Sequence, residues 1–165
     1  MLKKLKKTMV VAAAAVTLST GFATVAPQEA QAAHWADLDM RWAFKNGIVT
    51  ADLRDNLATR QDAWLMIYRD RKQASPGDGY AQARAYVIKR HFSDGSRGTD
   101  WITRNEMIGM LYQGLGNGPA WNSKYGFSRA RQWGINNGFY DGSRGNDFAT
   151  RAEIIAMLHR LDGNR

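Results

Sequence analysis

Thr59-Arg60-Gln61-Asp62, Thr103-Arg104-Asn105-Glu106 and Thr150-Arg151-Ala152-Glu153 are three versions of one tetrad, spaced by 44 and 47 residues. The string Asp94-Gly95-Ser96-Arg97-Gly98, ahead of the second tetrad, returns ahead of the third as Asp141-Gly142-Ser143-Arg144-Gly145. Recurrence at a fixed period of this size is the signature of a repeat architecture. The sequence therefore predicts three related units.

Each tetrad marks the start of a helix. A Thr followed three residues later by Asp or Glu, ahead of an apolar run, is a capping box, and an acid in the first turn suits the helix dipole. Apolar residues follow at helical spacing, as at Met107, Met110 and Leu111. We expect these helices to end near residues 72, 115 and 161. A first helix in each unit is expected at about 35–46, 80–90 and 123–136. No long strand pattern appears, so the predicted class is all-α, mainly helical, with a β-bridge or two in the loops.

The N-terminal segment has the pattern of a secretory signal peptide. A basic stretch at residues 1–7 precedes an apolar run at 9–18 and the small-x-small site Ala30-Gln31-Ala32. The apolar run is too short and too rich in Ala to be a comfortable membrane span, and no stable membrane span is expected after cleavage. We expect a signal peptide at 1–32 and a secreted single domain at 33–165, with repeats at 34–73, 79–116 and 120–163.

Composition bounds the partners of this domain. The chain has a formal net charge of +8, and the predicted signal peptide holds four Lys and one Glu, which leaves +5 on residues 33–165. Most of the remaining cations are Arg, whose planar donor fork suits carboxylates and phosphates. No nucleic-acid motif is present, so we expect no nucleic acid partner. The chain has no Cys, so packing alone must hold the domain together.

These motifs resemble those of the S-layer homology family. Unit one carries His34-Trp35-Ala36 and Gly47-Ile48, and unit three carries Gly138-Phe139-Tyr140-Asp141-Gly142 ahead of its tetrad. The match spans essentially residues 33–165. The loop of unit one is shorter than the family's, and unit two lacks the His-Trp-Ala and Gly-Ile elements.

The resemblance implies a pseudo-threefold bundle that binds secondary cell-wall polysaccharide in grooves between its units. In such domains an acidic, often pyruvylated sugar meets the tetrad Arg, which here is Arg60, Arg104 or Arg151. The departures in units one and two imply that not all three grooves are functional.

The tetrad Arg also invites this reading on physical grounds. A cation in the first turn of a helix opposes the helix dipole, so its presence in all three units suggests a function. One hypothesis is a guanidinium beside helix N-terminal amides, all facing an anion. The alternative is a structural ion pair with an acid of the neighbouring unit.

The loops and the exposed tryptophans supply further candidates. Ser96 and Arg97, and their counterparts Asp141, Gly142, Ser143 and Arg144, offer sugar-binding groups, although simple turn chemistry explains the same residues. Trp35 and Trp121, near unit starts, are candidates for stacking on sugar rings. Trp64 and Trp101 are expected to pack in the core, Trp101 at the position where the family has Ile.

Catalysis has little support in the sequence. Glu106 and Glu153 are the only glutamates of residues 33–165, and both belong to capping boxes. His34, His91 and His159 lack metal-ligand spacing, so neither a metal nor a cofactor is expected. We therefore predict a non-catalytic cell-wall-binding protein of the cell surface, whose partner is secondary cell-wall polysaccharide or a peptidoglycan-associated glycan. The alternatives are a secreted lytic or antimicrobial protein, and an interaction module that has lost sugar binding.

Overall fold

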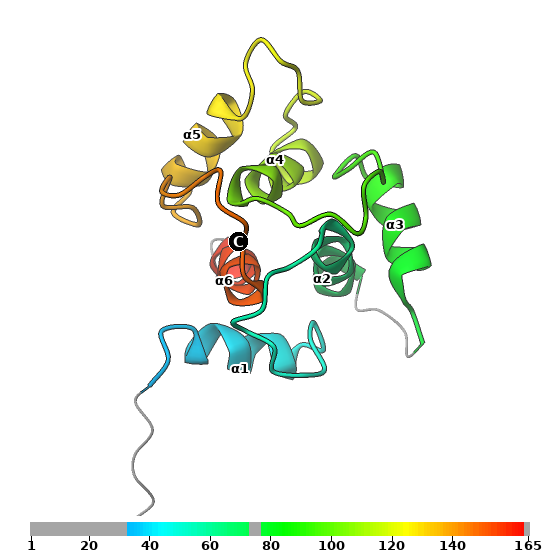
Figure 1. Cartoon of the computed structure of the whole chain (residues 1–165), viewed down its shortest axis with the longest axis vertical. Helices are drawn as coiled ribbons and strands as arrows, with labels where there is room; N and C mark the ends of the chain where they lie inside the picture. The colour runs from blue at the N-terminus through cyan, green and yellow to red at the C-terminus, as the bar shows by residue number, and fades with distance from the viewer. Residues whose placement is uncertain (1–32, 73–76, 164–165) are drawn as a thin grey trace, which may run out of the picture. The chain divides into compact units, whose positions relative to one another are not determined.

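The computed structural model describes residues 33–72 and 77–163, and this part of the chain is helical with no strand. The all-α prediction is confirmed. The helices, shown in Figure 1, are α1 (Asp37–Lys45), α2 (Arg60–Lys72), α3 (Tyr80–Lys89), α4 (Arg104–Leu115), α5 (Ser128–Asn136) and α6 (Arg151–Gly163). Residues 33–165 group into one compact unit. The predicted signal peptide lies outside the described residues.

The capping boxes form as the tetrads predict. At α4, the Thr103 hydroxyl accepts from the Glu106 amide at 3.1 Å, and the Glu106 carboxylate accepts from the Thr103 amide at 2.9 Å. The same reciprocal pair closes the starts of α2 and α6. One predicted start is wrong: α5 begins at Ser128, not at residue 123. Gly126 has φ +52°, which a right-handed helix cannot include.

The closest helix pairs do not follow the sequence units. α3 packs on α2, and α5 packs on α4, so each of these first helices lies against the second helix of the preceding unit. α1 packs on α6, which brings the two ends of the described chain together (Figure 1). The core lies mainly on α2, α4 and α6. It includes Trp64, which is 2% exposed and confirms its predicted place.

Three short extended segments link the units ahead of α2, α4 and α6. The Ala58 amide donates to the Ala149 carbonyl at 3.0 Å, Ala149 donates to Ile102 at 2.9 Å, and Ile102 donates to Ala58 at 3.0 Å. Three isolated β-bridges accompany this closed cycle, one more than the sequence suggested. The cycle joins each unit to the other two. The pseudo-threefold symmetry of the whole bundle stays a prediction.

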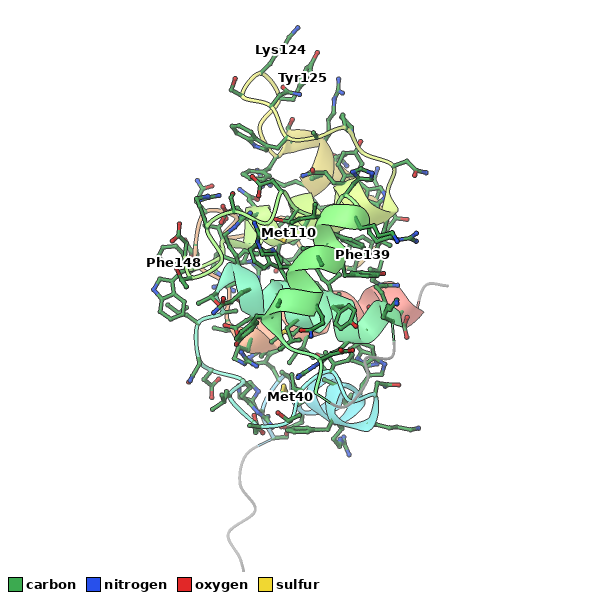
Figure 2. The ribbon with its side chains drawn as sticks, turned by 90° about the vertical axis from the view of Figure 1, so that its right-hand side faces the viewer. Met40, Met110, Lys124, Tyr125, Phe139 and Phe148 are labelled. Atoms are coloured by element: carbon green, nitrogen blue, oxygen red, sulfur yellow. The ribbon has the colours of Figure 1, made fainter. Side chains whose placement is uncertain are left out.

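Trp101 is not in the core. Side chains alternate along an extended segment, and the residues that turn inward are Ala58, Ile102 and Ala149, each fully buried. Their predecessors turn outward: Trp101 is 47% exposed and Phe148 is 50% exposed. Figure 2 shows Phe148 at the edge of the molecule. The expectation for Trp101 was wrong by one register position, because Ile102 occupies the buried place.

Candidate functional site

The tetrad arginines pair with the capping acids of neighbouring units. Arg60 contacts Glu106 at 3.1 Å, Arg104 contacts Glu153 at 2.8 Å, and Arg151 contacts Asp62 at 3.0 Å. The ion pairs therefore run from unit one to two, from two to three, and from three back to one. The alternative that the sequence left open, a structural pair between units, is present at all three positions.

The helix N-terminal amides are also engaged between units. The Arg104 and Asn105 amides donate to the carbonyls of Asp147 and Gly145, at 3.1 and 2.8 Å. The first two amides of α2 and of α6 donate in the same way to the loops of units two and one. An anion therefore cannot use these amides, and that part of the sequence hypothesis is wrong. Each tetrad Arg therefore has a structural ion pair, and it can contact a ligand only where its side chain borders a groove.

The repeated loops form the turns that their composition predicts. Asp141 Oδ1 accepts from the Ser143 amide at 2.9 Å, and Asp94 accepts from Ser96 in the same way. Arg97 and Arg144 then adopt positive φ values of +54° and +46°. Their side chains turn back to the neighbouring capping acids, Arg97 to Glu106 at 2.8 Å and Arg144 to Glu153.

One cavity brings together four of the predicted site residues from all three units. It has a volume of about 240 Å³. Its predicted members are Trp35 of unit one, Arg104 of unit two, and Asp141 and Arg144 of unit three. Its other lining residues are Phe139, Tyr140, Glu153, Ala156, Met157 and Arg160. We call this cavity the arginine groove. Trp35 reaches it because α1 packs on α6.

The guanidinium of Arg104 is held rigidly at the floor of the groove. It contacts Asp141 Oδ1 at 2.6 Å and Glu153 Oε1 at 2.8 Å, and it lies 5.5 Å from the ring centroid of Tyr140. Partial burial raises the pKa of Asp141. The hydrogen bond from the Ser143 amide and the charge of Arg104 together lower this pKa by more, so it lies below the ordinary value. This carboxyl is therefore ionised at neutral pH.

Arg160 is the member of the groove that the sequence did not single out. It is exposed and makes no ion pair within the described parts of the chain. Among the residues that line the groove, the cations Arg104, Arg144 and Arg160 outnumber the acids Asp141 and Glu153 by one, which gives the lining one surplus positive charge. The only available signal was its place in the last turn of α6, which many cations share because it suits the helix dipole.

The groove continues into a wider depression of about 730 Å³ that also includes Trp35 and Arg160. Asn136, Asn137 and His159 border this second space. His159 is oriented there by a contact of 2.7 Å with Asp39 and by stacking on Trp42, with ring centroids 4.7 Å apart.

The other predicted residues lie elsewhere. Arg60, Ser96 and Arg97 form the corresponding cluster between units one and two, where the Ser96 carbonyl accepts from Arg60 at 3.2 Å. Arg151 lies against Asp62 Oδ1, which also accepts from the Tyr80 hydroxyl at 2.9 Å. Trp121 borders a small separate cavity of about 20 Å³.

Gly142 and Ser143 support the groove from behind through their backbone. The Ser143 carbonyl accepts from Arg104 at 3.2 Å, and the Gly142 carbonyl accepts from Arg131 at 2.7 Å. Among residues 33–72 and 77–163, no group of three or more acidic or His side chains could hold a metal ion. No helix in these ranges is both long and apolar enough to cross a membrane.

Comparisons with known proteins identified no relative of this chain. No protein-family model matches the chain, and no curated protein or solved structure is detectably similar to it. The resemblance to the S-layer homology family therefore depends on the motifs quoted above.

Proposed function

We propose that residues 33–165 bind an acidic secondary cell-wall polysaccharide non-covalently, and that the arginine groove is the binding site. The observation that carries this proposal is the convergence of Arg104, Arg144 and Arg160 beside the exposed ring of Trp35. This set offers guanidinium forks for a carboxylate and an aromatic face for a sugar ring.

Charge and rigidity both favour an anionic ligand. The surplus positive charge of the groove is supplied by Arg160, which no acid of the described residues neutralises. Arg104, whose side chain is 6% exposed, contacts both carboxylates of the groove and so holds them in place before a ligand binds. Such preorganisation lowers the entropy cost of association.

The shape of the site supports a polymer rather than a small ion. Trp35 and Arg160 border both the groove and the wider depression beside it, so the two spaces adjoin. A terminal acidic sugar in the groove would place the next residues of the chain near Asn136, Asn137 and His159. Amide and imidazole groups are suitable partners for hydroxyls.

A binding role is also favoured over hydrolysis of the glycan. A glycosidase requires a carboxylic acid that stays protonated near neutral pH, which means a raised pKa. In the groove, the pKa of Asp141 is lowered, and Glu153 contacts both Arg104 and Arg144. The lowered pKa keeps Asp141 ionised and unsuited to donate a proton.

The test is a sedimentation assay of residues 33–165 with purified cell-wall sacculi, before and after chemical removal of the secondary polysaccharide. Arg160→Ala and Trp35→Ala are each expected to weaken binding by about tenfold, the loss of one exposed contact. Arg90→Ala is the matched control, because Arg90 is an exposed arginine outside the groove.

Three results would count against the proposal. Binding that survives removal of the polysaccharide would exclude it as the ligand. Equal weakening by Arg160→Ala and Arg90→Ala would reduce the effect to net charge. A fall in turbidity of the sacculi would indicate a lytic activity instead.

A further inference from the structure

A second, chemically different cavity lies between the loops of units two and three. It has a volume of about 690 Å³ and is bordered by the aromatic rings of Trp101, Phe127 and Phe148. Its polar members are Arg97, Thr99, Asp100, Thr103, Glu106 and Asn146. We call it the aromatic cavity. It shares no lining residue with the arginine groove.

The backbone keeps two of these rings turned outward. Trp101 and Phe148 are bridge residues, paired with Thr59 and Thr103 respectively, and each precedes a fully buried side chain. Because side chains alternate on an extended segment, neither ring can turn into the core without breaking the bridge. Each of these residues therefore stays about half exposed to water, at the hydrophobic cost that exposed aromatic area carries.

The aromatic cavity has no unpaired cation in its lining. Arg97 contacts Glu106 at 2.8 Å and lies 3.9 Å from Asp100, while Glu106 also pairs with Arg60. Arg97 is the one cation that lines the cavity, against the two acids Asp100 and Glu106, whereas three cations and two acids line the arginine groove. An acidic ligand has no unpaired cation to meet here.

Polar groups at the rim can orient a ligand on the rings. The Asp100 side chain is 54% exposed, and within the described ranges the one ion pair of its carboxylate is the long contact of 3.9 Å to Arg97. Asn146 is held by Asn105, which donates to its oxygen at 3.1 Å and so directs the Asn146 amide group. Thr99 and Thr103 also line the cavity.

We propose that the aromatic cavity binds an uncharged glycan strand of equatorially substituted pyranose rings, such as a β-1,4-linked glucan. A pyranose with all substituents equatorial has two flat C–H faces, which suit Trp101 and Phe148, and a rim of hydroxyls, which suit Asp100 and Asn146. Because its lining has no unpaired cation, the cavity suits an uncharged ligand better than an acidic one. This second site is independent of the function proposed for the arginine groove.

The test is titration calorimetry of residues 33–165 with cellohexaose. Trp101→Ala is expected to weaken binding by about tenfold, the value of one lost aromatic contact. Leu57→Ala is the matched control: Leu57 occupies the same bridge register in unit one but does not line the cavity. A parallel titration uses β-1,4-mannohexaose, whose axial hydroxyl interrupts one C–H face, and weaker binding is expected.

Each alternative outcome overturns the proposal. Absence of heat with cellohexaose excludes an uncharged glucan. Equal effects of Trp101→Ala and Leu57→Ala place binding elsewhere. Concentration-dependent dimerisation that Trp101→Ala abolishes, without glycan binding, assigns the rings to a second copy of the chain. Arg160→Ala is expected to leave cellohexaose binding unchanged, so failure of one site is distinguishable from failure of the other.

Discussion

Arg104 and Arg144 contact the same oxygen of Glu153, but the first side chain is buried and the second is exposed. The Arg104 side chain is 6% exposed, whereas that of Arg144 is 55% exposed. Removing one partner of a buried pair leaves an uncompensated charge, which typically costs 3–5 kcal/mol, while an exposed pair contributes about 0–1 kcal/mol. The same contact therefore has a structural role at Arg104 and leaves Arg144 available to a ligand.

At this scale we predict a large difference between two variants. Arg104→Met is expected to lower the free energy of unfolding by about 3 kcal/mol, the low end of that range because Glu153 keeps Arg144. Arg144→Asn, which tolerates the positive φ, is expected to lower it by less than about 1 kcal/mol. Urea denaturation of both variants checks this. Equal losses would show that the burial difference has no energetic weight.

At the scale of elements, α2, α4 and α6 each start at a point where two units meet. The start of α4 combines the capping box of Thr103 and Glu106 with amide donation from Arg104 and Asn105 to the loop of unit three. All early amides of the helix thereby find acceptors, as buried backbone donors must. The Glu106 side chain also links local helix formation to the contact between units, because it caps α4 and accepts from Arg60 of unit one.

The cap can be tested separately from the contact between units. Thr103→Ala removes the hydroxyl that accepts from the Glu106 amide, and we expect a loss of about 1 kcal/mol in the free energy of unfolding. Thr103→Ser keeps the hydroxyl and is expected to lose clearly less. Thermal unfolding monitored by circular dichroism compares the two. If both variants lose the same amount, the methyl group rather than the cap is responsible.

At the scale of the whole molecule, the carboxylates of Asp62, Glu106 and Glu153 each pair with an arginine of another unit, so that every unit is linked to the other two. Burial raises the pKa of Glu106 and of Asp62, but hydrogen bonds from Thr103 and Thr59 and nearby arginines outweigh it, so both pKa values are lowered. A native carboxyl with a lowered pKa binds its proton less tightly than the unfolded chain does. The stabilisation is present above the ordinary values of 4.5 and 3.8, and it is lost as the pH falls below them.

We therefore predict acid destabilisation with a defined origin. The free energy of unfolding is expected to be constant near neutral pH and to fall below about pH 4.5. Glu106→Gln is expected to be less stable than the original protein at pH 7, with a difference that shrinks by pH 3. Urea denaturation across this range measures both curves. Parallel curves with a constant offset would rule out Glu106 as a contributor to the pH dependence.

The sequence alone was sufficient for local features. Thr103 with Glu106 identified a helix start because a capping box is a contact over three residues, and the Asp141-Gly142-Ser143 turn followed for the same reason. The start of α5 and the side of Trp101 were missed: the first depends on the conformation of Gly126, the second on a one-residue register that bridges to other units decide.

Only the tertiary structure decided which residues share a site. Trp35 and Arg60 both belong to unit one of the sequence. The packing of α1 on α6 instead places Trp35 beside Arg104, Arg144 and Arg160, which come from the other two units. The physical reason is that a repeat pattern specifies which face of each helix is apolar, but not which of three similar helices will cover it. That choice is made by packing across the ring of units.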